Sequence, residues 1–185
     1  MDLRSTGALF GALLCVSAAV WGDPWPEIAI PPENARGLTR PVPRPGPGDV
    51  EARARLLFRA LQTGARDDLG AAAGFFFERL PFLAVKDMSG AAGYHATLLR
   101  SYRRDIEAYR AERPELAGAQ FDRFELSRAC TWMTPGREAN RLPYWSCYRS
   151  KLHYRTAAGR PRELEVRVMI HWGARWFVTH LRPFH

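Results

Sequence analysis

The chain has 185 residues, a length that favours one domain with short appendages. Its hydrophobic content of 46%, including 12% aromatic residues, is enough for a packed core and excludes general disorder. The formal net charge is +8, but only Lys86 and Lys151 of the 27 basic residues are lysines. A GC-rich genome produces such an arginine excess by codon supply alone. It is therefore poor evidence for nucleic-acid recognition, although the charge still favours anionic surfaces.

Residues 1–22 have the pattern of a secretory signal peptide. Arg4 supplies a positive start, residues 7–20 are apolar and uncharged, and 16–18 or 20–22 offer cleavage sites. The apolar run is short and rich in Ala and Gly for a membrane span, which favours a cleaved signal peptide. An uncleaved anchor is the alternative. We expect export to the periplasm or the extracellular space, and no transmembrane segment in the mature chain.

Export bears on the three cysteines. Cys15 would leave with the signal peptide, so that Cys130 and Cys147 remain. An even count in an oxidising compartment favours a disulfide. The two lie about equally far from the loop centre at 137–138, which places them opposite each other in a hairpin. Strict alternation puts them on opposite faces, so the bond requires a β-bulge near 127–128.

Residues 23–48 carry eight of the fourteen prolines and are predicted to form an extended, mostly solvated linker. A spacer off the membrane is the plainer interpretation, and a proline-rich ligand for a recognition module is the other. We expect the folded domain to span residues 49–185 and limited proteolysis to trim the linker.

Three helices are predicted after the linker. Asp49 is a good N-cap for the first, which ends at Gly64 and has apolar residues at helical spacing. A second, weaker helix is expected over 68–79, followed by a short strand or extended crossing at 82–86. The third, over 91–112, has an apolar arc opposite an arginine-rich face.

From residue 121 onward the apolar spacing changes to two. Strands are expected near 121–132, 144–157, 163–172 and 175–181, the last two joined as a hairpin through Gly173-Ala174. Helices followed by an antiparallel meander indicate an α+β fold. We expect three N-terminal helices packed on a curved antiparallel sheet of about four strands.

This element order, ending in Gly173-Ala-Arg-Trp-Phe-Val-Thr-His-Leu181, resembles the nuclear-transport-factor-2-like (cystatin-like) superfamily over residues 50–182. Its members often finish on a strand of the G-x-W-x-V type. The resemblance implies a conical pocket, in which catalytic relatives use an Asp/His set for acid–base work. The superfamily includes dehydratases, isomerases, cyclases and many non-catalytic modules, so the fold alone gives no function.

The third predicted helix carries the catalytic candidates His95, Tyr102 and Asp105. His95 projects near the centre of the apolar arc and Asp105 toward one edge. A low-dielectric pocket would move the pKa of a His or Asp toward the working pH. The alternative, which we favour, is a buried histidine hydrogen-bonded to its neighbours, with Asp105 at the solvent boundary.

Basic residues alternate along one predicted strand at Arg149, Lys151, His153 and Arg155, with Arg167 on the next. They form a cationic stripe that suits lipopolysaccharide, an acidic glycan or an acidic partner. Alternating charge on a solvated sheet face explains the pattern as well.

His171 and His180 lie on the same face of the last predicted hairpin, with His153 as a candidate neighbour, and three imidazoles on one sheet face could bind a metal. In the expected register, however, His171 faces Trp176 and His180 faces Arg167, so the histidines are not direct partners. No carboxylate or thiol accompanies them at ligand spacing, and no metal is predicted.

Standard catalytic signatures are absent from the sequence. Glu138 and Asn140, in the loop between the cysteines, are further candidates for ligand contact.

The leading hypothesis is an exported, non-catalytic binding or accessory module of unknown ligand. The alternative is a small pocket enzyme with lyase- or isomerase-like chemistry at His95 and Asp105. No cofactor or nucleic acid is expected. The sequence does not identify a partner. The options are an anionic surface, a small ligand and a second copy of the chain bound through a sheet face.

Overall fold

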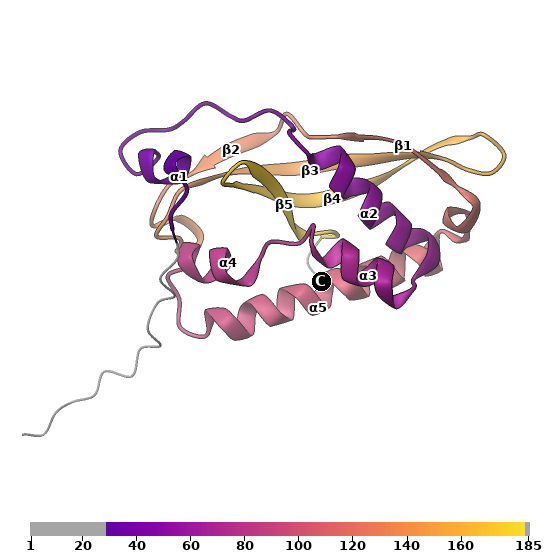
Figure 1. Cartoon of the computed structure of the whole chain (residues 1–185), viewed down its shortest axis with the longest axis horizontal. Coiled ribbons are helices and arrows are strands. Elements are labelled where there is room, and N and C mark those ends of the chain that lie inside the picture. Colours follow the sequence, from indigo (N-terminus) through magenta and orange to yellow (C-terminus); the bar gives the residue numbers. More distant parts are fainter. Residues whose placement is uncertain (1–28, 184–185) are drawn as a thin grey trace, which may run out of the picture.

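The computed structural model describes residues 29–183, so the predicted signal peptide and the first residues of the linker lie outside the described residues (Figure 1). The α-helices are α1 Pro32–Arg36, α2 Val50–Thr63, α3 Arg66–Ala73, α4 Arg79–Val85 and α5 Ala91–Glu112. The strands are β1 Gln120–Glu125, β2 Cys130–Met133, β3 Tyr144–Arg155, β4 Pro161–Trp172 and β5 Arg175–His180. The expected mixture of helices and antiparallel sheet is confirmed, with five helices in this range where three were expected.

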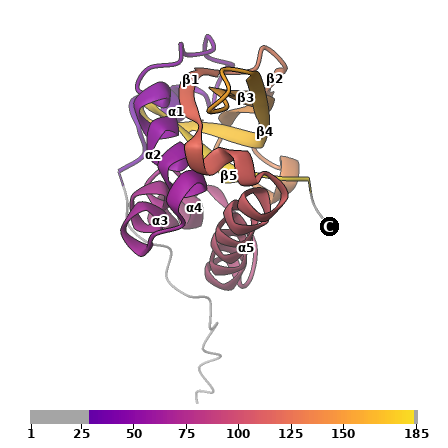
Figure 2. The same ribbon diagram turned by 90° about the vertical axis from the view of Figure 1, so that its right-hand side faces the viewer.

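The strands form one curled antiparallel sheet in the order β1-β3-β4-β5, and β2 pairs with the opposite end of β3 from β1. Helices α2 to α5 cover one face of the sheet, and α5 runs along its length (Figures 1 and 2). We call this the inner face and the opposite one the outer face. None of the helices within residues 29–183 combines the length and apolar character that crossing a bilayer requires.

Helices α2 and α5 match their predicted bounds, although the Asp49 side chain makes no capping hydrogen bond to α2. The former begins after Asp49 and ends at Gly64, whose φ of 62° is the left-handed conformation that glycine adopts without a Cβ clash. The latter has the predicted bounds and buries the apolar arc, including Leu98 and Ile106, against the rest of the fold.

The segment after α3 corrects two predictions. The second helix ends at Ala73 instead of residue 79, and the expected strand or crossing at 82–86 is largely helix α4. Pro81 lies in the first turn of α4, where its missing N–H would have no partner anyway. The residues between the helices pair instead with the edge of β5, since Phe77 N donates to the Val178 carbonyl at 2.9 Å.

The predicted bulge between β1 and β2 is confirmed. Glu125 pairs with Lys151 and Cys130 with Cys147, so four residues on one strand face three on the other. The extra residue turns Cys130 to the side of Cys147. The two form a disulfide with Cα atoms 4.0 Å apart, as predicted.

A second bulge, in β5, was not expected. Val168 pairs with His180 but Met169 pairs with Val178, so Thr179 is an extra residue. The predicted pairing of His180 with Arg167 is therefore wrong, because the bulge rotates His180 onto the inner face.

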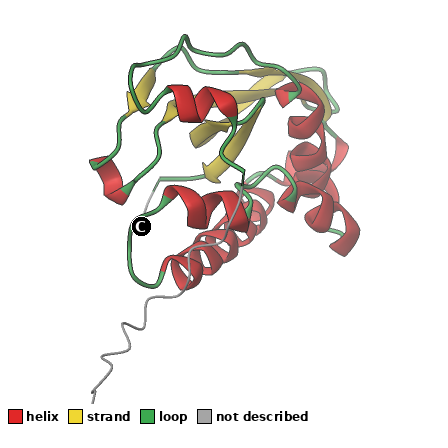
Figure 3. Ribbon diagram, turned by 60° about the vertical axis from the view of Figure 1, so that its left-hand side comes forward, coloured by secondary structure: helices red, strands yellow, loops and turns green. Residues whose placement is uncertain are grey.

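Residues 37–48, here called the strap, cross the outer face between α1 and α2 (Figure 3). Most of their side chains are exposed, as expected of the linker, but the backbone is fastened to the sheet. The indole nitrogen of Trp145 donates to the Val42 carbonyl at 3.0 Å, and that of Trp176 donates to the Gly46 carbonyl at 2.9 Å. Buried indole N–H groups need acceptors, and the strap carbonyls supply them. No local sequence pattern predicted this docking.

Candidate functional site

A cavity of about 370 Å³ lies between α4, the first half of α5 and the inner face of the sheet. We call it the inner cavity. Its walls are largely apolar, and the exposed side chains of Met88 and Tyr94 lie at its edge. The apolar lining residues are Phe77, Phe82, Val85, Met88, Tyr94, Leu98, Val168 and Ile170. A few polar groups within an apolar hollow are typical of small-molecule sites.

The polar lining comes from four separate parts of the chain. Lys86 follows α4, Glu138 lies in the loop between β2 and β3, and Tyr144 begins β3. The Lys86 ammonium donates to the Glu138 carbonyl oxygen at 2.9 Å. From the end of β5, the Nδ1 atom of His180 lies 3.1 Å from the Thr179 hydroxyl. The fold thus brings a cation, a carboxylate, a phenol and an imidazole to one hollow.

Backbone pairing holds Lys86 beside the loop. Lys86 forms an antiparallel bridge with Asn140, and Arg141 N donates to the Val85 carbonyl at 2.9 Å. In the same loop, Glu138 and Ala139 have φ angles of 49° and 51°, which non-glycine residues adopt at a cost of about 1–3 kcal/mol. Such strained segments gather at functional sites, and this one borders the cavity.

Burial sets the charge state of the cavity. It lowers the pKa of His180 to about 4, and the nearby Lys86 ammonium acts in the same direction. Burial also lowers the pKa of Lys86, with Glu138 opposing the shift, and raises that of Tyr144, which Glu138 raises further. At neutral pH the imidazole is therefore uncharged and the phenol protonated, so both can share hydrogen bonds with a ligand.

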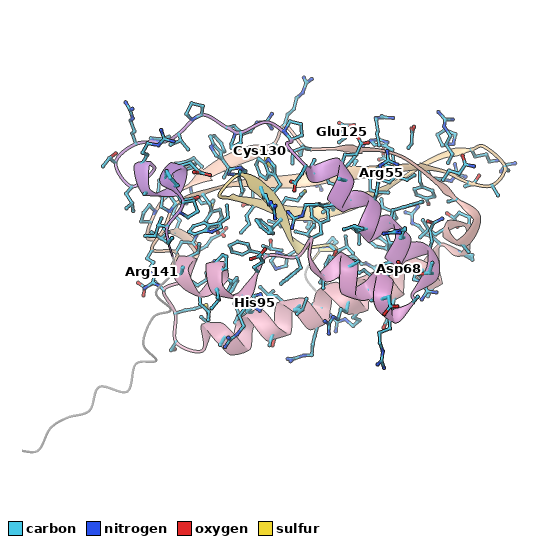
Figure 4. The ribbon with its side chains drawn as sticks, viewed as in Figure 1. Arg55, Asp68, His95, Glu125, Cys130 and Arg141 are labelled. Carbon is cyan, nitrogen blue, oxygen red and sulfur yellow. A yellow bond between two sulfur atoms is a disulfide. The ribbon has the colours of Figure 1, made fainter. Side chains whose placement is uncertain are left out.

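The three catalytic candidates do not line the inner cavity. His95 is buried on α5, where its Nε2 donates to the Phe77 carbonyl at 2.8 Å (Figure 4). Its ring lies 5.2 Å from that of Phe82. Tyr102 is also buried, and its hydroxyl donates to the Ala72 carbonyl at 3.1 Å. Asp105 follows His95 by ten residues, which is about 15 Å along a helix. The structure therefore does not bring His95 and Asp105 together.

The two loop candidates differ in position. Glu138 is exposed and borders the cavity. Asn140 is buried beneath it, where its side-chain amide donates to the Tyr144 hydroxyl at 3.0 Å. Asn140 therefore orients a cavity residue.

Glutamates neutralise most of the predicted cationic stripe. Each basic side chain from Arg149 to His153 has a carboxylate within 4 Å on a neighbouring strand, and Arg167 has one two residues away on β4. The pairs are Lys151–Glu163 at 2.8 Å, His153–Glu125 at 3.1 Å, Arg167–Glu165 at 3.1 Å and Arg149–Glu165 at 3.7 Å. Arg155 is exposed at the end of β3. The paired cations have little charge left for an anionic ligand.

The histidines considered for a metal lie apart. His153 contacts glutamates on the stripe, His171 is buried on the outer face beside Trp176, and His180 lines the inner cavity. The expected pairing of His171 with Trp176 is confirmed. Within residues 29–183, no group of three His, Cys, Asp or Glu side chains is placed to hold a metal ion.

Sequence reasoning missed Lys86, Tyr144 and His180 as cavity residues. Lys86 carried a usable signal, because it is one of two lysines in a chain that otherwise uses arginine. Tyr144 and His180 carried none, since their inward direction follows from the sheet's pairing and from the bulge at Thr179.

Comparison with known proteins gives no further guide. No family model matches the chain, and neither a curated protein nor a solved structure matches it.

Proposed function

We propose that this protein is an exported, non-catalytic module that binds a small amphipathic molecule in the inner cavity. The observation that carries the proposal is the composition of the cavity, in which apolar walls from α4, α5 and β4 enclose a cluster of hydrogen-bonding groups. The apolar part of the ligand would lie along Phe82, Leu98 and Ile170. Its polar end would meet Lys86, which has an ammonium donor, and the uncharged imidazole of His180.

Two further observations support this proposal. The Cys130–Cys147 disulfide suits an oxidising compartment, in agreement with the export signal expected at residues 1–22. A pocket between helices and a curled sheet is also what the resemblance to the nuclear-transport-factor-2-like superfamily implies, and we retain membership of that superfamily as part of the proposal.

The test is a thermal-shift screen of the protein against amphipathic small molecules, with affinities then measured by calorimetry. Val168→Trp fills the cavity from its sheet side. Because the valine side chain makes no hydrogen bonds, the loss of binding that we expect would come from the lost space. Arg162→Gln, on the exposed start of β4, is the matched control and should leave the affinity unchanged. Ligands that bind both variants equally would place the site elsewhere and refute the proposal.

A second candidate function is acid–base catalysis in the same cavity, with His180 in place of His95. It is favoured by one observation, an imidazole kept neutral by burial beside the Lys86 ammonium. Turnover of a ligand from the screen that His180→Gln abolishes, while binding persists, would support catalysis over binding alone. Binding without turnover in the unmodified protein would exclude catalysis on that ligand.

A further inference from the structure

The strap and the outer face enclose a second hollow, a cleft of about 890 Å³ that shares no residue with the inner cavity. We call it the outer cleft. Trp132 of β2, Trp145 of β3 and His171 of β4 line its sheet side, and prolines of the strap line the other side. The two indole rings lie 5.6 Å apart at an angle of 63°. The cleft is therefore bounded by aromatic rings on one side and by proline rings on the other.

The arginines around the outer cleft differ from those of the stripe. Arg40 has no hydrogen-bond or ion-pair partner among residues 29–183, and Arg36 uses only its Nε, which donates to the Pro32 carbonyl at 3.3 Å. Apart from Arg155, the basic residues of the stripe are paired with glutamates, as Lys151 is with Glu163 at 2.8 Å. The cleft contains one acidic side chain, Glu33, against these two arginines. An anionic ligand would thus find two available guanidinium groups here, whereas on the stripe only Arg155, at the end of β3, has no glutamate partner among the described residues.

The rings indicate what else the ligand should carry. Indole rings offer flat apolar faces that accept another ring by stacking, and pyrrolidine rings add apolar surface, while the edges of the ligand ring stay free for polar groups. Guanidinium forks suit a carboxylate at such an edge. Asn34 lies at the same end of the cleft, although its amide is already used, donating to the Pro143 carbonyl at 2.8 Å and accepting from Gly173 N at 3.2 Å.

We propose that the outer cleft binds an acidic saccharide, with a sugar ring against Trp132 and Trp145 and its carboxylate paired with Arg36 and Arg40. A saccharide satisfies both requirements, because one face of the ring is apolar and its carboxylate and hydroxyls project from the edge. The net charge of +8 attracts such a ligand at long range. This site is separate from the one under the proposed function.

The test is calorimetric titration of the full chain with trigalacturonic acid, and with cellotriose as the uncharged saccharide of the same length. We expect the acidic trimer to bind and to quench tryptophan fluorescence, and added salt to weaken binding. The double variant Arg36→Gln/Arg40→Gln should bind about ten-fold more weakly. Trp132→Phe keeps an aromatic ring against Gly37, and should weaken binding by removing indole stacking area.

Two control variants locate the site. Arg162→Gln removes an exposed arginine outside the cleft, and Val168→Trp fills the inner cavity, so neither should change the affinity for the acidic trimer. The proposal is overturned if cellotriose binds as tightly as the acidic trimer, or if the arginine double variant keeps full affinity. Absence of binding by the acidic trimer up to about 5 mM also overturns it. The outer cleft and the inner cavity share no lining residue, so a negative result with the acidic trimer does not refute the proposed function.

Discussion

The inner cavity and the outer cleft are formed by neighbouring residues of the same two strands. Ser146 and Ile170 face the cavity, whereas Trp145 and His171, one position away, face the cleft. What differs is the cover. Packed helices close the cavity, while a proline-rich strap held by two indole hydrogen bonds closes the cleft. One stretch of sheet therefore borders two hollows with different covers and different chemistry.

The chemical difference follows from burial. In the cavity, burial lowers the pKa values of Lys86 and His180, so the site favours uncharged or weakly charged contacts. At the cleft, Arg36 and Arg40 are exposed and keep guanidinium groups available to solvent. The comparison predicts that the cavity depends on core packing and pH, and the cleft on the strap and on salt.

The largest expected effect concerns the disulfide, which staples β2 to β3 near the outer cleft. The double variant Cys130→Ser/Cys147→Ser should lower the free energy of unfolding by about 3 kcal/mol, because the crosslink spans 17 residues. Urea denaturation measures it. Thiol labelling of the unreduced, denatured wild-type protein should detect neither Cys130 nor Cys147. Two reactive thiols there would contradict the bond.

The next effect is a pH dependence from the inner cavity. The folded pKa of His180, about 4, lies below the ordinary value of 6.5, so between these values the unfolded chain binds a proton that the folded protein does not. Stability should therefore be full above pH 6.5 and fall toward pH 4, by at most about 3 kcal/mol. Other titratable side chains that line this cavity are those of Lys86, Glu138, Tyr144 and Tyr148.

Denaturation curves at several pH values measure this loss, and His180→Gln should reduce it. His171 adds a change in the same direction, because burial lowers its pKa too, so the difference between the two proteins is the decisive quantity. An unchanged pH profile in the variant would show that His180 is not the titrating group.

A third prediction concerns the packing beneath the cavity. His95→Ala should lower the free energy of unfolding by about 1–3 kcal/mol, since it orphans the Phe77 carbonyl and leaves space beside Phe82. Equilibrium denaturation is the measurement. Folded His95→Gln protein should keep ligand binding in the cavity. Loss of binding or turnover in that variant would instead return His95 to the catalytic candidates.

The smallest effect tests the strap alone. A Cβ on Gly37 would lie 2.5 Å from the Trp132 ring, so Gly37→Ala should loosen the strap at a cost of about 1 kcal/mol. Gly46→Ala is the matched control, because a Cβ there meets nothing within 4 Å. Limited proteolysis should cut residues 37–48 faster in Gly37→Ala than in Gly46→Ala. Equal rates would show that the strap does not depend on this contact.

Local patterns in the sequence determined much of the architecture. Helices α2 and α5 and strands β3 to β5 follow from apolar spacing and from the breakers at Gly64 and Gly173, since these signals act within a few residues. The disulfide was also predicted, from the even cysteine count and the equal distance of Cys130 and Cys147 from the loop centre, and the structure contains the bulge that the bond required.

Tertiary pairing decided the sites. The bulge at Thr179 turns His180 inward, and no alternation rule places an extra residue. Likewise, the strap docks because Trp145 and Trp176 find carbonyl acceptors more than 100 residues away in the chain, a contact that no local pattern contains. Sequence spacing specifies which way a residue points within its own element. Which residues share a cavity depends on how elements distant in the chain pair and pack.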